Sequence, residues 1–532
     1  MTSSATSLRK APEALANQLP ARSRTPQAPG SKAPWRDWLA LGLLMFPVLL
    51  IAVDNTALTF ALPAIARSLE TTGVQLLWIV DAYPLVLAGL LVAMGSLGDR
   101  IGRRRLLLVG SIGFALVSAA TAFAPSAEWL IAGRAALGFF GAMLMPSTLS
   151  LIRNIFPDPN RRRLAIAIWA AGFSGGAALG PIFGGWLVEQ FWWGAVLLVA
   201  VPIMLPLLAF GPAFIPESRD PRPGRVDVPS MLLSLLVMVP VVYGIKEVAT
   251  EGFGVMPLAS VTFGVAMGFV FVRRQQRLAN PLLDMSLFSN RVFSTAISAN
   301  VLALFSFNGF ILFLAQHLQL LEGMSPSAAG VAMIPALLAT VTAGLVAVPL
   351  VRRIRPGFVV AGGLSLSAGG YLMVTVGDHS AGPALLLGAL FILALGVGTA
   401  ETISNDLILG SAPAEKSGAA AAISETGYEV GSVLGTAILG SILTASYQQN
   451  LRLPAGLAEA TSHTAADRAG ETLAGAMELA GTLPGPLATA VREASRAAFD
   501  SGVHITAAIA LVLMAAAAVL AAVVLRKVPT AR

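Results

Sequence analysis

Apolar runs long enough to cross a membrane recur along almost the whole chain. About 20 apolar residues are needed to cross the hydrocarbon core of a bilayer, and backbone groups there must bond internally, which favours helices. The chain has 532 residues, of which 56% are hydrophobic and 12% are charged. A transmembrane β-barrel would show shorter, alternating segments instead. We therefore predict an all-α polytopic membrane protein with about fourteen spans. The predicted spans cover residues 38–66, 76–97, 106–124, 128–152, 164–188, 192–214, 229–247, 255–272, 292–318, 326–351, 357–376, 382–410, 416–447 and 503–525.

Positive charge is concentrated on one side of these spans. Of the 35 Lys and Arg residues, 28 fall in the two termini and in the loops after even-numbered spans. This is the positive-inside pattern, which predicts that both termini are cytoplasmic. Of the other seven, Arg134 lies inside a span, Arg67 and Lys246 flank short loops on the opposite side, and four lie in the segment 448–502. The net charge of +7 therefore indicates orientation and contact with anionic lipid, with no nucleic acid as partner.

The chain ends and the rare residue types exclude several classes. Residues 1–37 contain no apolar region of their own, so we predict a disordered cytoplasmic tail and not a cleaved signal peptide. Residues 526–532 are expected to form a second cytoplasmic tail. The chain has no cysteine, and its four histidines are far apart, which excludes disulfides and argues against a metal site. No P-loop sequence is present, and we expect neither a cofactor nor a metal.

An internal repeat divides the predicted spans. At an offset of 255 residues, one row of glycines matches another without gaps: Gly172, Gly176, Gly180 and Gly185 correspond to Gly427, Gly431, Gly435 and Gly440. The offset predicts two six-helix bundles, at 38–214 and 292–525, and a linker at 215–291 that carries two inserted helices. Parallel repeats with a substrate site between them are typical of rocking secondary transporters. Glycines at four-residue spacing also serve plain close packing of helices, whatever the function.

The segment 448–502, before the last span, is too polar to cross a membrane. Its helical pattern around 464–480 and the break at Pro484 and Pro486 predict a short helical hairpin. We expect this extracytoplasmic loop to lie over the external mouth of the bundle.

A glycine- and arginine-rich loop joins the second and third spans. An acid at a helix end beside an arginine cluster can form a cytoplasmic latch in one state and break in the other. The alternative is a tight turn with charges that retain it in the cytoplasm. The loop resembles the signature loop of the major facilitator superfamily, and the equivalent loop at 352–357 lacks the acid. The candidate latch residues are Gly95, Asp99, Arg100, Gly102 and Arg103.

The fifth predicted span carries glycines around a proline. Proline is tolerated inside membrane helices because neighbours satisfy the carbonyl that it frees, and here it predicts a pliable, closely packed helix. The segment resembles the motif that marks antiporters within the superfamily, and export rests mainly on this resemblance. The candidate motif residues are Gly172, Gly176, Gly180, Pro181, Gly184 and Gly185.

Three charged residues inside predicted spans are candidates for proton coupling. A carboxyl group in apolar surroundings, as expected for Asp54 and Asp81, can exchange protons near neutral pH. An arginine such as Arg134 needs a partner or water inside a membrane, unless its side chain reaches the surface. The segment 53–57 resembles the first-helix motif of fourteen-helix drug:proton antiporters. Arg134 resembles the fourth-helix arginine of that family, which the resemblance implicates in proton transfer.

A pair of acids in the thirteenth span is the strongest candidate for a cation site. Glu425 and Glu429 are four residues apart and share one helical face. Two carboxyl groups this close are coupled, so the pair can hold a proton when empty and an organic cation when ionised. The alternative is a pair solvated at the cytoplasmic mouth near Lys416. The segment 424–429 resembles the acidic segment of quaternary-ammonium exporters.

Other side chains extend this candidate site. Glu401 lies deep in the twelfth span and needs a partner or water. Tyr83 and Tyr428 adjoin acids, and aromatic rings bind cations through their faces. The candidate substrate-binding residues are therefore Glu425, Glu429, Glu401, Tyr83 and Tyr428.

The chain from about residue 36 to 527 is similar to the fourteen-helix drug:proton antiporter family of the major facilitator superfamily. Within it, the motifs resemble those of the QacA-like and SmvA-like quaternary ammonium exporters. The resemblance implies a major facilitator fold and a monomer in the bacterial inner membrane, not an enzyme. It also implies that the protein exports lipophilic cations, such as quaternary ammonium biocides, dyes and biguanides, in exchange for protons. Some members that export divalent cations carry an extra acid in the tenth helix, which the segment 334–340 lacks.

Two other functions stay open at this point. A proton-driven exporter of a specific antibiotic or lipid-like metabolite would share the fold, but the intramembrane acids favour cations. A membrane-embedded enzyme or sensor that kept the transporter fold would need a catalytic constellation or an appended domain, and the sequence contains neither.

Overall fold

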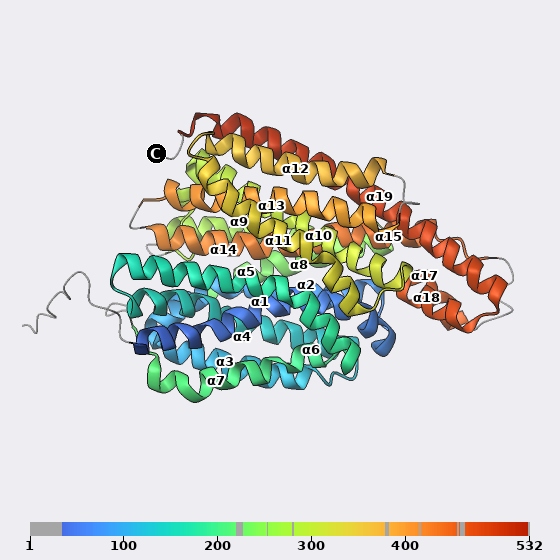
Figure 1. The fold of residues 1–532 in the computed structure, drawn as a ribbon, viewed down its shortest axis with the longest axis horizontal. Coiled ribbons are helices and arrows are strands. Elements are labelled where there is room, and N and C mark those ends of the chain that lie inside the picture. The colour runs from blue at the N-terminus through green and yellow to red at the C-terminus, as the bar shows by residue number, and fades with distance from the viewer. Residues whose placement is uncertain are drawn as a thin grey trace, which may run out of the picture.

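Long helices run side by side through the molecule, and a short helical hairpin projects beyond one end of them (Figure 1). This computed structural model describes residues 35–219, 227–252, 254–278, 281–377, 382–413, 416–454, 457 and 463–529. The regular elements within these ranges are helices, which confirms the all-α fold class predicted from the apolar runs. The predicted tail at 1–37 lies almost wholly outside the described residues.

Local sequence explains where several helices of the first bundle begin. Thr72 and Gln75 form a reciprocal capping box at the start of the second helix, and Asp158 accepts a hydrogen bond from the Arg161 amide at the start of the fifth. Such caps satisfy amide groups that have no partner in a first helical turn. The first bundle consists of α1 (Trp35–Leu69), α2 (Gly73–Ile101), α3 (Arg103–Thr121), α4 (Ala127–Ile155), α5 (Pro159–Gln190), α6 (Ala195–Leu198) and α7 (Ala200–Phe214).

Two inserted helices follow, α8 (Val228–Glu251) and α9 (Val255–Arg277), and they pack against each other. α8 also contacts α2 of the first bundle and α15 (Gly440–Asn450) of the second. Only 17% of the apolar window of each inserted helix is buried, against 67% for α2. The pair therefore lies at the edge of the molecule and presents most of its apolar surface outward, as expected for contact with lipid.

The second bundle contains longer and more interrupted helices. Its elements are η1 (Met285–Ser289), α10 (Arg291–Gln316), η2 (His317–Leu321), α11 (Pro326–Leu350), α12 (Pro356–Val376), α13 (Pro383–Ser411), α14 (Ser417–Leu434), η5 (Gly435–Leu439), α15 (Gly440–Asn450), α17 (His463–Glu471), α18 (Leu473–Thr482), α19 (Gly485–Val524) and η6 (Leu525–Lys527). Of these, η2 and η5 are single π-helical turns that continue α10 and α14.

The last helix differs from the prediction. Its span was expected at 503–525, but α19 begins at Gly485, because helical residues continue well beyond the apolar run. Pro484 and Pro486 stand at the start of α19, where a proline costs no hydrogen bond. The predicted hairpin is present as α17 and α18. We call the end of the molecule that carries them the hairpin end, and the end where α1 begins and α19 stops the terminal end (Figure 1).

The number of membrane-spanning helices agrees with the prediction. Among the described residues, 13 helices are long and apolar enough to cross a membrane, and 14 if bent pairs are counted as one span. The bent pair belongs to α5, where segments 164–177 and 179–190 meet at 40°. The proline of the predicted pliable helix, Pro181, lies just beyond this bend.

Buried apolar side chains form two large clusters that follow the two bundles. One draws on α1 to α7 and the other on α10 to α19. Phe60 of α1 is buried in the second cluster, and Leu312 of α10 in the first. α1 and α10 thus lie where the bundles meet.

The glycine rows of the repeat have equivalent packing partners. A Cβ atom at Gly176 of α5 would lie 3.4 Å from the Leu49 Cα of α1, and one at Gly431 of α14 would lie 3.2 Å from the Leu304 Cβ of α10. Leu49 and Leu304 are themselves separated by the 255-residue offset. The repeat therefore describes a shared helix-packing geometry, since corresponding glycines admit corresponding helices.

Candidate functional site

Asp54 and Arg134 form a buried ion pair inside the first bundle. The Asp54 Oδ2 lies 2.7 Å from Arg134 Nη1, and the side chains are 4% and 2% exposed. Asp54 is near the middle of α1, whose apolar length carries it far from either end, and Arg134 projects from α4. The alternative in which Arg134 reaches the surface is wrong, because a partner within the bundle holds the guanidinium.

Arg134 also connects this pair to α2. Its Nε donates a hydrogen bond to the Ile79 carbonyl at 3.2 Å, and its guanidinium lies 4.6 Å from the centre of the Tyr83 ring. Tyr83 is fully buried and belongs to this arginine site more than to the acids of α14. A change in the charge of Asp54 would therefore alter the contacts that join α1, α2 and α4.

Asp81 forms a second buried ion pair. Its Oδ2 lies 2.8 Å from the Lys246 Nζ of α8, and neither side chain is exposed. Its Oδ1 accepts a hydrogen bond from Thr436 of η5. The prediction that Lys246 flanks a loop is wrong, because α8 continues to Glu251 and places the lysine inside the bundle. Asp81 is likewise enclosed by helices.

The acids of α13 and α14 form one cluster. Glu401 and Glu425 are close enough for their charges to interact, as are Glu425 and Glu429. Glu429 is 2% exposed, and the other two are half-buried. Tyr428 lies among all three. We call Glu401, Glu425 and Glu429 the acid cluster.

The acid cluster forms no salt bridge within the described part of the chain. Lys416, which the sequence placed near Glu425, pairs instead with Asp284 at 2.6 Å. Desolvated negative charge without a counter-ion is costly. The cluster can therefore bind protons or an external cation.

The acid cluster faces the first bundle. Glu429 lies beside Asn55 of α1, and its charge reaches Tyr83. The Tyr428 ring lies 6.0 Å, edge to face, from the ring of Phe173 on α5. Glu429 of the second bundle therefore contacts Asn55, the residue that follows Asp54 in α1.

A small central cavity lies between the two bundles. Its walls combine Asn55, Thr56 and Arg134 of the first bundle with Asn308 and Ser432 of the second. Its volume is about 30 Å³, room for roughly two water molecules. In this state the cavity can hold water that relays protons, but an organic cation would need the bundles to separate.

The glycine motif of α5 packs this helix against α1. A Cβ at Gly180 would lie 3.1 Å from the Val53 carbonyl oxygen, and one at Gly184 would lie 2.8 Å from the Ala57 carbonyl oxygen. Gly185 faces the opposite way, where a Cβ would lie 2.4 Å from the Pro326 carbonyl oxygen of α11. The motif therefore allows α5 to lie tightly between α1, which carries Asp54, and the second bundle.

The predicted latch loop makes its charged contacts within the first bundle. Asp99 pairs with Arg103 at 2.6 Å. Arg104 donates hydrogen bonds to the carbonyl oxygens of Pro212 and Ile215, at 3.1 and 3.0 Å, and its amide donates to Glu217 at 3.1 Å. Arg100 is exposed at the end of α2. Glu217 was missed in the sequence because it stands outside the signature loop.

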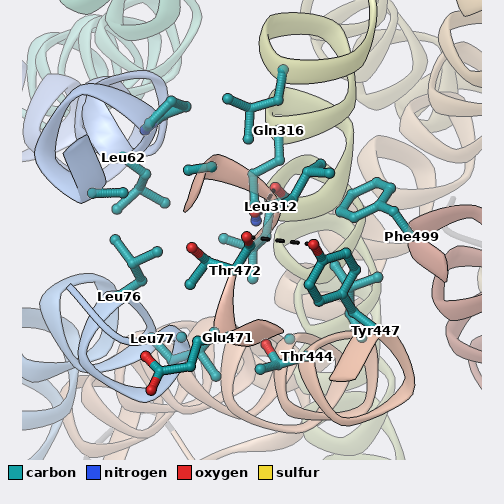
Figure 2. A pocket seen from close by; sticks show the side chains of 18 residues that line it. Leu62, Leu76, Leu77, Leu312, Gln316, Thr444, Tyr447, Glu471, Thr472 and Phe499 are labelled. Carbon is teal, nitrogen blue, oxygen red and sulfur yellow. Dashed lines mark hydrogen bonds between the residues drawn. The ribbon is translucent and has the colours of Figure 1, made fainter. Parts of the chain in front are cut away.

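The bundles meet at the hairpin end, around a second cavity. Figure 2 shows Leu62 and Leu76 of the first bundle facing Gln316, Thr444 and Tyr447 of the second across this space. The hairpin covers it, and the Tyr447 hydroxyl donates to the Ala469 carbonyl of α17 at 3.0 Å. Glu70 also forms an ion pair with Arg468. These contacts close the hairpin end, and the acid cluster does not line the cavity.

Several residues of the site could not be assigned a role from the sequence. Thr436 is an ordinary polar residue. Asn55 and Thr56 lie in the 53–57 motif, but their contacts depend on which helices pack together. Lys246 carried a usable signal, since a lysine within an apolar span implies a partner at the same depth.

Comparison with known proteins identifies the family. Residues 44–436 match the family model described as Major Facilitator Superfamily. The multidrug efflux pump LfrA of Mycolicibacterium smegmatis is 52% identical over 497 residues, covering 93% of this chain and 98% of that protein. The methyl viologen resistance protein SmvA of Salmonella typhimurium is 37% identical over 467 residues, covering 87% and 93%.

A solved structure shares the fold. It is a bacterial homologue of the human lysosomal transporter Spinster in an inward-facing conformation, with a TM-score of 0.66 and 18% identity over 94% of this chain and 100% of that one. The helical bundle, the family model and the extensive identity to transporters agree. This chain therefore belongs to the major facilitator superfamily and is a multi-pass membrane transporter, not an enzyme.

Proposed function

We propose that this protein is a multidrug antiporter that exports lipophilic organic cations in exchange for protons. The observation that carries the proposal is the acid cluster, three interacting carboxyl groups at the bundle interface that no described Lys or Arg neutralises. An organic cation supplies the missing charge, and the neighbouring Tyr428 ring offers it an aromatic face. Quaternary ammonium biocides, dyes and biguanides have this chemistry.

The relatives support this proposal. Their names describe a multidrug efflux pump and a methyl viologen resistance protein. The bacterial relatives and the distribution of Lys and Arg favour the inner membrane, with both termini in the cytoplasm. The hairpin end is then extracytoplasmic, and we expect the protein to act as a monomer.

Proton coupling is proposed to act through Asp54 and Arg134. A proton on Asp54 removes its negative charge, so that Arg134 loses its ionic partner. The guanidinium would then depend on the Ile79 carbonyl and the Tyr83 ring, both on α2. Protonation thus changes how α1, α2 and α4 are held together, next to the central cavity that Arg134 lines. Antiport requires such a link between proton binding and helix arrangement.

Ethidium efflux from energised cells tests the proposal. We expect efflux that stops when a protonophore collapses the proton gradient. The variant Asp54→Asn should abolish coupled efflux while reaching the membrane in normal amount, because the amide cannot exchange the proton. Asp406→Asn is the matched control, since Asp406 is an exposed acid of α13. Efflux that is insensitive to the protonophore, or wild-type efflux by Asp54→Asn, would contradict the mechanism.

Substrate charge has a separate test. If the acid cluster binds cations, uncharged antibiotics and lipid-like metabolites should not compete with ethidium for efflux. Competition by neutral compounds and none by quaternary ammonium compounds would favour the specific metabolite exporter instead.

A further inference from the structure

The inserted helix α8 places a lysine against the first bundle. Lys246 Nζ lies 2.8 Å from Asp81 Oδ2, and both side chains have no exposed surface. The ammonium also lies 4.1 Å from the centre of the Trp78 ring of α2. A carboxylate and an indole face are the usual partners of a buried ammonium group. The lysine is therefore held by two side chains one helical turn apart.

The second bundle contributes to the same place. Thr436 donates a hydrogen bond to the free oxygen of Asp81 and belongs to the π-helical turn η5, an irregularity often found at functional sites. Its hydroxyl also lies 3.1 Å from the carbonyl oxygens of Ser432 and Val433. Thr436 thus has other acceptors on its own helix. We call Asp81, Lys246, Trp78 and Thr436 the Asp81 junction.

Apolar side chains pack beside the junction. Leu85 of α2, Val242 of α8, and Val433 and Ala437 of the second bundle form one buried cluster beside it. The junction therefore joins three parts of the molecule in a buried environment. Thr436 also lines the central cavity, so a proton in the cavity is one side chain away from Asp81.

The charges of the junction restrict how these parts can separate. Breaking a buried ion pair by removing one partner is strongly unfavourable, because the other charge stays buried without its counter-ion. If α2 moved away from α8 with both charges intact, the Asp81 carboxylate and the Lys246 ammonium would lose each other as counter-ions. A proton taken up by Asp81 changes the balance, since the neutral acid no longer needs the ammonium.

We propose that Lys246 is a positioning residue for Asp81. Lys246 holds the Asp81 carboxylate between the inserted helix and both bundles, and this contact keeps the hairpin end closed until Asp81 is protonated. The inserted helices then take part in the transport cycle, although most of their surface faces outward. The protonation step rests on the proposed function, whereas the closing role does not depend on it.

Labelling of a single cysteine tests the closing role without transport. The chain contains no cysteine, so Thr444→Cys introduces one thiol, in the cavity at the hairpin end. A membrane-impermeant maleimide should label it slowly when Lys246 is intact. Lys246→Met should speed labelling roughly fivefold or more, the usual range for coupled sites. Lys246→Arg keeps the charge and should label at close to the parent rate.

Thr436→Val provides a variant that introduces no uncompensated charge. It removes only the contact from the second bundle, and it should also speed labelling of Thr444→Cys. Unchanged labelling in both Lys246→Met and Thr436→Val, at equal amounts of folded protein, would overturn the closing role. These results do not depend on the substrate, so they stand even if proton-driven cation efflux is not found.

A neutral pair tests the protonation step. In the double variant Asp81→Asn/Lys246→Gln the two side chains can still hydrogen-bond, and slow labelling should return. Proton-driven ethidium efflux should stay at least roughly tenfold below the parent, since no proton can be bound at position 81. Parent-level efflux by this variant would show that the pair serves packing alone and would overturn the protonation step.

Discussion

Thr56 supports the bend of α5, and a cycle of substitutions can measure how much. Pro181 has no backbone N–H, so the Ala177 carbonyl four residues earlier loses its helical donor. The Thr56 hydroxyl lies 3.1 Å from the Ala177 oxygen. It also lies 3.2 and 3.3 Å from the carbonyl oxygens of Ala52 and Val53, whose helical donors are present within α1. The 40° bend of α5 occurs next to Ala177. Thr56, which contacts Ala177, follows Asp54 by two residues in α1.

The expected size of the effect follows from one hydrogen bond inside a membrane protein. Such bonds are worth about 0.6 kcal/mol on average and at most about 1.7 kcal/mol. With RT near 0.59 kcal/mol, these values correspond to roughly threefold and 18-fold changes in an equilibrium between conformations. Thr56→Val keeps the shape of the side chain and removes the hydroxyl. We expect initial ethidium efflux to fall within this range at equal protein amount, and Thr56→Ser to retain it.

The partner substitution makes the prediction specific. In Pro181→Ala the alanine N–H supplies the missing donor to Ala177, so the hydroxyl of Thr56 becomes dispensable. Thr56→Val should then have little further effect in the Pro181→Ala background, and a double-mutant cycle should give a coupling energy near the value of one hydrogen bond. Equal effects of Thr56→Val in both backgrounds, or failure of Thr56→Ser to rescue, would refute the reasoning.

Three further predictions concern other parts of the molecule. Gly185→Ala should impair efflux by forcing α5 and α11 apart at the hairpin end. Gly175→Ala should not impair efflux, because a Cβ at this position meets nothing within 4 Å. Equal efflux by the two variants would contradict the packing role of Gly185. Glu425→Gln should narrow the range of exported cations in competition assays, and an unchanged range would remove Glu425 from the binding site. The Lys416 ammonium holds the pKa of Asp284 below its ordinary value, so their pair stabilises the fold at neutral pH and loses its effect as the pH falls through the lowered pKa. Lys416→Gln should cost less than about 1 kcal/mol of stability because the lysine is partly exposed. The difference in thermal stability between this variant and the parent should shrink below about pH 4. A difference that grows on acidification would refute the assignment.

The helices could be predicted closely because membrane spans are encoded locally. Each apolar run must satisfy its own backbone groups, so its length and composition determine a helix without knowledge of its neighbours. The errors occur where helices outlast the apolar run. α19 begins at Gly485 instead of 503, and α8 extends to Glu251. Because of the second error, Lys246 was expected at the end of a span beside a loop, and not in the interior of the molecule.

The partners of the buried charges could not be predicted in the same way. Asp54 and Arg134 are 80 residues apart, and their pairing depends on how α1 and α4 are aligned in depth. Resemblance to a family pointed to both residues separately, without showing that one neutralises the other. The pairing of Asp81 was harder still, because it needs the packing of α8 and of η5 against α2. Residue types therefore indicated the chemistry, and helix packing determined which charges are compensated.

The two bundles share a packing plan but not their charges. At the 255-residue offset, Asp54 corresponds to Gly309 and Arg134 to Ala389, while Glu425 corresponds to Ala170 and Glu429 to Ser174. The buried acids of the first bundle have counter-ions, which are Arg134 of the same bundle for Asp54 and Lys246 of the inserted helix α8 for Asp81, whereas the acid cluster of the second forms no described salt bridge. A neutral pair can be opened by a proton, and an uncompensated cluster attracts a cation. Under the proposed mechanism, the symmetric part of the molecule provides the rocking geometry, and the asymmetric charges divide the tasks, with the proton bound in the first bundle and the substrate in the second.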